Sequence, residues 1–348
     1  MAPFLEDSMF NTTHVTSTED TLTYFEVPLH KIIRLIANDI CGILSIVLNA
    51  MNLVVLKHIT CFGEVTICLL KVLAIVDLCT GVVVILLENA YLLTSIPDYW
   101  DGFCKTLFPV VVFCGLFSCF LLGLLSFDRY MAIRKPLRYP VLFTRKWLVF
   151  MVIGCGFVAL CDVVLTSWRT LPLDGFVFNE GTRFCRMDIA GSGNTSAYLM
   201  IGNLTVLVAV ILITYINIHL VIIAWRHATK IRDSEVMSQA PESANLTATS
   251  VPGNMTPTPT RRPRVRRRNE FRALRTVLVM TLAYYLAWLP MFIDVSMYVL
   301  SQYDTPAVYE FFTYYMPYSN SWWNPVIYLL MNRAYRKAAR RHVFCFYK

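Results

Sequence analysis

Long apolar stretches separated by short polar segments follow one another along the chain from residue 32 onward. Seven of them meet the length criterion for a helix that crosses a bilayer, about 20 mostly apolar residues. They cover residues 32–56, 65–93, 104–133, 147–168, 197–225, 270–300 and 306–331. The pattern predicts an all-α membrane protein in which residues 32–331 form a seven-transmembrane helix bundle. Because seven is an odd number, we expect the two termini on opposite sides of the membrane.

Polar segments frame this bundle and interrupt it. Residues 1–31 are a polar N-terminal tail without the apolar core of a signal peptide. Residues 226–269 form the longest loop, and its Pro-, Ser- and Thr-rich part at 234–263 is typical of disorder. We expect residues 332–348 to form a short amphipathic eighth helix followed by a tail.

The composition supports a membrane protein. Hydrophobic residues make up 56% of the chain and charged residues 16%, against ~25% charged residues in a soluble domain. The net charge of +8 comes from basic residues in the loops between apolar stretches. A nucleic-acid surface would gather such residues on one face with interleaved aromatics, so the pattern excludes nucleic acid as a partner.

The basic residues also predict how the bundle lies in the membrane. Of the 31 Lys and Arg residues, 23 fall on the side that holds the C-terminus and six on the opposite side. Cytoplasmic loops carry the excess of Lys and Arg. We therefore expect a cytoplasmic C-terminus and an extracellular N-terminal tail.

This orientation sorts the sites of covalent modification. Of eleven cysteines, only Cys104 and Cys185 fall at or beyond the outer surface, which predicts a disulfide between them, with two free thiols as the alternative. Asn11 and Asn194 are glycosylation sequons on the outer side. Cys345 follows the short basic segment after the last span and is a candidate palmitoylation site.

Charged and polar residues inside the apolar stretches are the candidates for function. Asp128 and Arg129 end the third stretch, where an intramembrane arginine needs a partner; the alternative is an interfacial arginine that extends its side chain to water. Asp77 places a carboxylate in the middle of the second stretch.

Five short motifs carry a resemblance to a known family, from about residue 32 to residue 348. The chain resembles the rhodopsin-like (class A) G-protein-coupled receptors. The motifs are LNAMNLVVL around Asn49, LAIVDL ending in Asp77-Leu78, Asp128-Arg129-Tyr130 followed by KPLRYP, Trp288-Leu289-Pro290, and Asn324-Pro325-Val326-Ile327-Tyr328. The resemblance implies a plasma-membrane receptor, not an enzyme, that binds an extracellular ligand and activates heterotrimeric G proteins, with arrestin as a further partner.

The resemblance also implies roles for individual residues. It implies an allosteric Na⁺ site, and no other cofactor, formed by Asp77, Ser118, Asn320, Ser321 and Asn324. A buried carboxylate with hydroxyl and amide oxygens around it offers ligands for a hard cation, and the alternative is a hydrogen-bonded polar patch between helices. It implies an activation switch in which Arg129 pairs with Asp128 and Glu270 in the inactive state, and Trp288 acts as a toggle beneath the ligand. The switch residues are Asp128, Arg129, Tyr130, Tyr215, Glu270, Asn324, Pro325 and Tyr328. The alternative for each aromatic residue is a place in the core.

The chain departs from the family pattern in places. Leu207 replaces the usual proline of the fifth helix, and Tyr284 replaces a phenylalanine in the sixth. Ala287 stands where a cysteine commonly precedes the tryptophan, and Gly156 near the usual tryptophan of the fourth helix. These differences concern the shape of the fifth helix and the detail of the toggle, and they leave the predicted fold unchanged.

The ligand pocket expected from the resemblance narrows the ligand class. Its residues are Glu88, Val111, Gly115, Trp288, Met291, Phe292, Tyr314 and Tyr318. Residues 304–331 contain no lysine for a retinal Schiff base, and Val111 occupies the position of the aspartate in monoamine receptors. The outer half carries the acids Glu88, Asp162, Asp294 and Glu310. The depth of Glu88 favours a basic peptide or a small cationic or polar ligand as its partner, and a helix–helix hydrogen bond is the alternative role for Glu88.

The sequence also bears on other ligands and on other classes of protein. A receptor for a lipid mediator or for an amine held in a non-classical way is the alternative within the family. A transporter would show internal repeats or broken helices around a site at mid-membrane, and the sequence shows neither. An intramembrane enzyme would need a catalytic pair at depth, and His219 has no matching partner. The sequence leaves the ligand and the G-protein subtype open.

Overall fold

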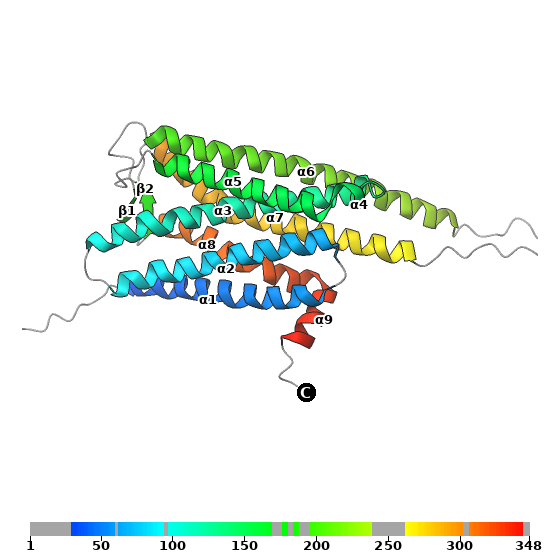
Figure 1. The fold of residues 1–348 in the computed structure, drawn as a ribbon, viewed down its shortest axis with the longest axis horizontal. Helices are drawn as coiled ribbons and strands as arrows, with labels where there is room; N and C mark the ends of the chain where they lie inside the picture. Colours follow the sequence, from blue (N-terminus) through cyan, green and yellow to red (C-terminus); the bar gives the residue numbers. More distant parts are fainter. Residues whose placement is uncertain are drawn as a thin grey trace, which may run out of the picture.

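The computed structural model describes residues 29–59, 62–93, 97–168, 176–179, 184–187, 195–238, 262–301 and 306–343. Near several helix ends and in the β-hairpin it describes the backbone alone. Long helices lie side by side in an elongated bundle (Figure 1). We call the end of the bundle near β1 and β2 the hairpin end, and the opposite end, near the last helix, the α9 end.

Each predicted span corresponds to one long helix. Six of the spans lie inside their helices, and the seventh begins one residue before its helix. The helices are α1 (Leu29–His58), α2 (Glu64–Leu93), α3 (Pro97–Arg134), α5 (Arg145–Trp168), α6 (Thr195–Ser238), α7 (Arg262–Ser301) and α8 (Ala307–Met331). Among the described residues, six helices are long and apolar enough to cross a membrane. The seventh, α8, carries Asn, Ser and Tyr residues and packs against α1, α2 and α7. The prediction of a seven-helix bundle is confirmed.

Three helices extend beyond the predicted spans by seven residues or more at one end. The third span was expected to begin at residue 104, but α3 begins at Pro97, a residue favoured in the first turn of a helix. α6 continues to Ser238 and α7 begins at Arg262, so helix occupies both ends of the loop expected at 226–269. Residues 234–238 and 262–263 are therefore helical rather than disordered. Hydropathy marks the part of a helix in the membrane, whereas Arg, Lys and Glu extend helices into water.

Two small elements were not anticipated from the sequence. α4 (Tyr139–Leu142) is a single turn between α3 and α5. β1 (Phe176–Asn179) and β2 (Phe184–Met187) form an antiparallel hairpin that contacts α3, with Cys185 opposite Phe178. Elements of four residues carry too little periodicity to be recognised from sequence.

The expected eighth helix is α9 (Arg333–His342), which turns away from the bundle axis (Figure 1). Asn332 alone separates it from α8, and the Asn332 side chain accepts hydrogen bonds from the backbone N–H groups of Ala334 and Tyr335. Such a cap satisfies amides that a helix N-terminus leaves unpaired. The α9 face that carries Tyr335 and Ala339 is buried.

The centre of the bundle is α3, which contacts α2, α5, α6 and α7. Leu121, Leu122 and Leu125 of α3 are fully buried in the core. In contrast, α5 exposes large apolar side chains such as Phe150 and Phe157. Exposed apolar side chains of this kind suit contact with lipid, because a bilayer is itself apolar.

Candidate functional site

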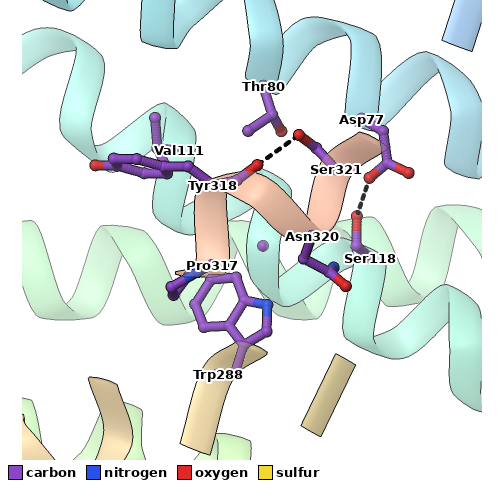
Figure 2. A pocket seen from close by; sticks show the side chains of 10 residues that line it. Asp77, Thr80, Val111, Ser118, Trp288, Pro317, Tyr318, Asn320 and Ser321 are labelled. Carbon is purple, nitrogen blue, oxygen red and sulfur yellow. Dashed lines mark hydrogen bonds between the residues drawn. The ribbon is translucent and has the colours of Figure 1, made fainter. Parts of the chain in front are cut away.

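A small cavity lies between α2, α3, α7 and α8 (Figure 2). Its volume is about 20 Å³, enough for one water-sized guest, which needs ~10–15 Å³. Asp77, Thr80, Val111, Gly115, Ser118, Trp288, Pro317, Tyr318, Asn320 and Ser321 line it. The cavity therefore joins residues that the sequence assigned to two sites, the sodium site and the ligand pocket.

Asp77 is the acidic group of this cavity. Its side chain is 2% exposed. The Ser118 hydroxyl donates to Oδ1 at 3.4 Å, and the Asn324 amide nitrogen donates to Oδ2 at 2.8 Å. Among the residues described, no basic side chain pairs with this carboxyl group. A buried carboxylate in this position needs a cation or a proton as its counter-charge.

Hydrogen bonds to the backbone hold the walls of the cavity in place. The Ser45 hydroxyl of α1 donates to the carbonyl oxygen of Asp77 at 2.7 Å. The Asn49 amide donates to the carbonyl oxygens of Ser45 and Ser321, at 2.9 Å in each case. α1 thus fixes α2 and α8 relative to each other beside Asp77. These bonds explain why Asn49 belongs to a sequence motif although it does not line the cavity.

The oxygen atoms around the cavity fit a small hard cation. Asp77, Ser118, Asn320 and Ser321 lie around the same space (Figure 2), and carboxylate, hydroxyl and amide oxygens are the ligands that such cations prefer. The Ser321 hydroxyl donates its proton to the Tyr318 carbonyl at 2.7 Å, which leaves its lone pairs available. Asn324 differs from the other four, because its amide nitrogen faces Asp77 and orients the carboxylate.

Gly115 and Trp288 meet at the cavity wall. A Cβ atom at Gly115 would lie 2.2 Å from the Cη2 atom of Trp288, so the indole occupies the space of a missing side chain. The Trp288 Nε1 atom is buried without a hydrogen-bond partner among the described residues. The indole therefore packs through its shape alone, against α3 on one side and Tyr284 at 5.5 Å between ring centroids on the other.

The other expected pocket residues lie toward the hairpin end. Val111, Tyr314 and Tyr318 belong to one buried apolar cluster, and Met291 packs against it. Phe292 is partly buried on α7. The side chain of Glu88 lies outside the described residues.

Of the four acids expected in the outer half, the side chains of Asp162 and Asp294 are described. Asp162 of α5 is half-buried and hydrogen-bonds Thr205 of α6. Asp294 of α7 is 7% exposed. The Thr313 hydroxyl of α8 donates to Asp294 Oδ2 at 3.4 Å. Asp294 is therefore a carboxylate held between two helices at the hairpin end.

A second polar site lies at the α9 end, around Arg129. The Arg129 side chain is 7% exposed, so it does not extend to water. Its Nε and Nη2 atoms donate to Asp128 Oδ2 at 3.0 and 2.5 Å, and Nη2 also donates to Thr66 Oγ1. The Thr66 hydroxyl donates to Asp128 Oδ2 at 2.8 Å, and the Tyr139 hydroxyl donates to Asp128 Oδ1 at 2.5 Å. Arg129 is thus held by α2 and by its own neighbour in sequence.

Thr66 and Tyr139 were missed from the sequence. Thr66 lies in the first turn of α2, and Tyr139 lies eleven residues after Asp128 in the single turn α4. Thr66 is one of few polar residues in an apolar stretch, a signal that could have identified it. For Tyr139 no signal exists in local sequence, because its contact with Asp128 depends on how the chain turns after α3.

The remaining switch residues are spread over the α9 end. Tyr130 lies beside Arg134, whose guanidinium carbon is 5.4 Å from the ring centroid. Tyr215 is 62% exposed, with its ring against His219. Tyr328 is buried against Tyr335, with the ring centroids 5.5 Å apart. Tyr215 therefore lies on the surface of the bundle, whereas Tyr328 lies in its core.

Pro325 lies inside α8, next to Asn324. The side chain of Glu270 lies outside the described residues, as do those of Cys104 and Cys185. Asn11, Asn194 and Cys345 also lie outside them. The salt bridge between Arg129 and Glu270, the disulfide, the glycans and the palmitoyl group remain predictions.

Comparison with known proteins decides the family. Residues 48–328 match the family model of the 7 transmembrane receptor (rhodopsin family). The chain belongs to this family. The match confirms the resemblance recognised from the motifs and identifies a multi-pass membrane protein. Because members of the family are receptors, the chain is not an enzyme.

The relatives include receptors named for amines. The octopamine receptor beta-2R of Drosophila melanogaster is 24% identical over 333 residues, which cover 88% of this chain and 59% of the relative. The alpha-1A adrenergic receptor of Oryzias latipes is 23% identical over 320 residues, covering 85% and 63%. The trace amine-associated receptor 8c of Rattus norvegicus is 28% identical over 315 residues, covering 86% and 81%. The chain thus spans about three fifths of the length of the first two relatives.

Proposed function

We propose that this chain is a plasma-membrane receptor that binds an extracellular cationic ligand and activates a heterotrimeric G protein. The observation that carries the proposal is the buried Asp128–Arg129 pair at the α9 end, closed by Thr66 and Tyr139. A buried ion pair that exchanges partners provides a two-state element, because each arrangement must satisfy the same charges. Membership of the receptor family supports this use of the pair.

The proposed signalling step is a displacement of α7. In the inactive state Arg129 pairs with Asp128 and with Glu270, which lies on α7 at the α9 end. Ligand binding favours the state in which α7 has moved outward, and the movement exposes a site for the C-terminal helix of the G protein. Arrestin uses the same end of the bundle. The N-terminal tail is extracellular and α9 is cytoplasmic, in agreement with the distribution of Lys and Arg.

We propose Na⁺ as an allosteric ion at Asp77. The support is a carboxylate without a described basic partner, together with the oxygen atoms of Ser118, Asn320 and Ser321 around a space of about 20 Å³. The ion supplies the counter-charge of Asp77 and favours the inactive arrangement. The residues themselves bind the ion and join α2, α3 and α8.

The proposed ligand is a small amine bound in a non-classical way. Relatives named for octopamine, adrenergic and trace-amine ligands favour an amine, but Val111 offers no charge at the expected anchor. We propose Asp294 as the counter-charge, because it is buried between α7 and α8 toward the hairpin end. Glu88, another of the four acids named from the sequence, has the same chemistry. If only a basic peptide or only a lipid mediator activates the receptor in the ligand screen, that ligand class replaces the amine.

Nucleotide exchange in membranes tests the proposed activity. Membranes from cells that express the chain with a promiscuous G protein are exposed to panels of amines, peptides and lipids. We expect at least one amine to increase binding of a non-hydrolysable GTP analogue. Arg129→Ala, compared at equal surface expression, should abolish the response. A panel that gives no response above untransfected membranes would contradict the proposal.

The counter-charge is tested with matched variants once an amine responds. Asp294→Asn and Glu88→Gln each remove one charge and keep the shape of the side chain. We expect Asp294→Asn to increase the concentration for half-maximal response at least tenfold, the size of one lost charge-assisted contact of ~1.4 kcal/mol or more. If only Glu88→Gln has this effect, Glu88 is the anchor and Asp294 is structural.

A further inference from the structure

Two adjacent tyrosines of α7 bind the backbones of two different helices. The Tyr284 hydroxyl donates to the carbonyl oxygen of Gly115 in α3 at 3.2 Å. The Tyr285 hydroxyl donates to the carbonyl oxygen of Val210 in α6 at 3.2 Å and lies 2.9 Å from the Thr214 hydroxyl. Neighbouring positions on a helix point about 100° apart, so this pair reaches toward both helices at one level.

Breaking these bonds affects the tyrosine hydroxyls more than the carbonyl groups that accept from them. A carbonyl oxygen within a helix already accepts a bond from its own ladder, so Gly115 and Val210 remain satisfied without the tyrosines. The Tyr284 side chain is 3% exposed, and its hydroxyl also hydrogen-bonds Cys119. If α7 moves away from α3, this hydroxyl loses its partners while it is still shielded from water. Buried hydroxyl groups without a partner are unfavourable, so the bonds resist the movement.

A proline that can act as a hinge lies close to the pair on the same helix. Pro290 is inside α7, six residues beyond Tyr284. A proline within a helix removes one backbone hydrogen bond and kinks the helix. The part of α7 from Arg262 to Leu289 can therefore change its angle about Pro290. The two tyrosine hydroxyls hold this part of the helix just below the hinge.

We propose that Tyr284 and Tyr285 form a latch that holds α7 against α3 and α6 and sets how readily α7 is displaced at the α9 end. The consequence for signalling rests on the proposed function. The latch is joined to the cavity, because Gly115 is both the acceptor for Tyr284 and the residue whose missing side chain is replaced by Trp288. A movement of the indole against α3 therefore acts on the same residue that accepts the Tyr284 bond.

Distance measurements on the purified receptor test the latch without a ligand or a G protein. Nitroxides are attached through p-acetylphenylalanine introduced at Lys146 of α5 and Arg275 of α7, both exposed near the α9 end. We expect Tyr284→Phe and Tyr285→Phe each to increase the fraction with a longer label distance about two- to tenfold, the effect of one net hydrogen bond. Phenylalanine keeps the ring, so both variants should fold.

Two further variants separate the latch from a general loss of packing. Tyr309→Phe removes a hydroxyl from an exposed tyrosine of α8, and the distances should equal those of the wild type. Thr214→Val should reproduce part of the Tyr285→Phe effect and add nothing to it in the double variant. If the distance distributions of Tyr284→Phe and Tyr285→Phe both coincide with the wild type, the latch is wrong.

Basal nucleotide exchange provides the second readout. We expect both phenylalanine variants to exceed the wild type in exchange without ligand, by the same two- to tenfold factor. Exchange that is absent in every variant, while the label distances still change, would overturn the proposed function and leave the latch intact. Changed exchange with unchanged distances would overturn the latch.

Discussion

Asp77 and Gly115 illustrate how single residues determine the cavity. Asp77 brings a charge into an apolar bundle and keeps it beside two hydrogen-bond donors. Gly115 brings an empty space, which the Trp288 indole fills. Asp77 was recognisable in the sequence because a carboxylate in an apolar stretch is rare. The role of Gly115 became clear only from the packing, because a missing side chain leaves no mark in hydropathy.

Removal of the Asp77 charge should abolish the effect of sodium. We expect Na⁺, compared with choline at equal ionic strength, to stabilise the wild-type receptor by about 1.4 kcal/mol at ten times its dissociation constant. In Asp77→Asn, thermal unfolding in detergent should no longer depend on the choice of cation. Equal unfolding temperatures of the wild type in Na⁺ and choline would contradict a sodium site.

A methyl group at Gly115 should displace Trp288. Gly115→Ala puts a Cβ atom 2.2 Å from the indole, and overpacking of this kind costs about 1–3 kcal/mol. Thermal unfolding should show this loss of stability, and tryptophan fluorescence should change. Gly154→Ala on α5 is the matched control, because a Cβ atom there meets no described atom within 4 Å. Equal effects of the two substitutions would show that the contact with Trp288 does not matter.

At the scale of elements, α9 is attached to α1 at both of its ends. The Tyr335 hydroxyl near its start donates to Asn52 Oδ1 at 2.9 Å. At its C-terminus, the ring of His342 stacks on that of His58, with centroids 3.8 Å apart. The sequence predicted that a basic helix follows the last span, but not these contacts, since α1 and α9 lie almost 300 residues apart. The Tyr139–Asp128 bond was hidden for a different reason, because it depends on how the chain turns after α3.

Acidification should loosen α9 from α1. The pKa of His342 lies below its ordinary value of 6.5, first because of partial desolvation and then because His58 and Arg341 are nearby. The docked state therefore binds fewer protons than an undocked one. Docking is fully favourable above about pH 6.5 and weakens as the pH falls through the lowered pKa.

Hydrogen exchange of the α9 amides measures this effect. After correction for intrinsic rates, we expect less protection at pH 5.5 than at pH 7.5. The variant His342→Gln keeps a polar side chain and should have the same protection at both values. Protection in the wild type that does not change with pH would contradict the role of the histidine pair.

At the scale of the whole molecule, α3 joins the two polar sites. Val111, Gly115 and Ser118 contribute to the cavity, and Asp128 and Arg129 form the site at the α9 end. The sequence motifs identified both sites because each motif places its charge at a fixed depth in a helix. The motifs could not show that the cavity and the ligand pocket share a wall, because this depends on how α7 and α8 pack against α3.

Loss of the acid at the foot of α7 should increase signalling without ligand. Glu270→Ala removes the second partner expected for Arg129 and leaves Asp128 in place. We expect basal nucleotide exchange to rise severalfold at equal surface expression, because one salt bridge of the inactive state is lost. Glu64→Ala, at the start of α2, is the control for loss of an acid at the same end. An unchanged basal rate in Glu270→Ala would contradict the pairing.

The corner at Asn332 has a consequence for the orientation of α9. Asn332 is both the C-cap of α8 and the N-cap of α9, so it is the one residue between the two helices. One additional residue inside the start of α9 would rotate every later side chain by about 100° around the helix axis. Tyr335 and Ala339 would then face away from α1, and the arginines would face the bundle. A single residue therefore fixes the rotation of α9 about its own axis. Insertions at this corner should be tolerated far less well than substitutions.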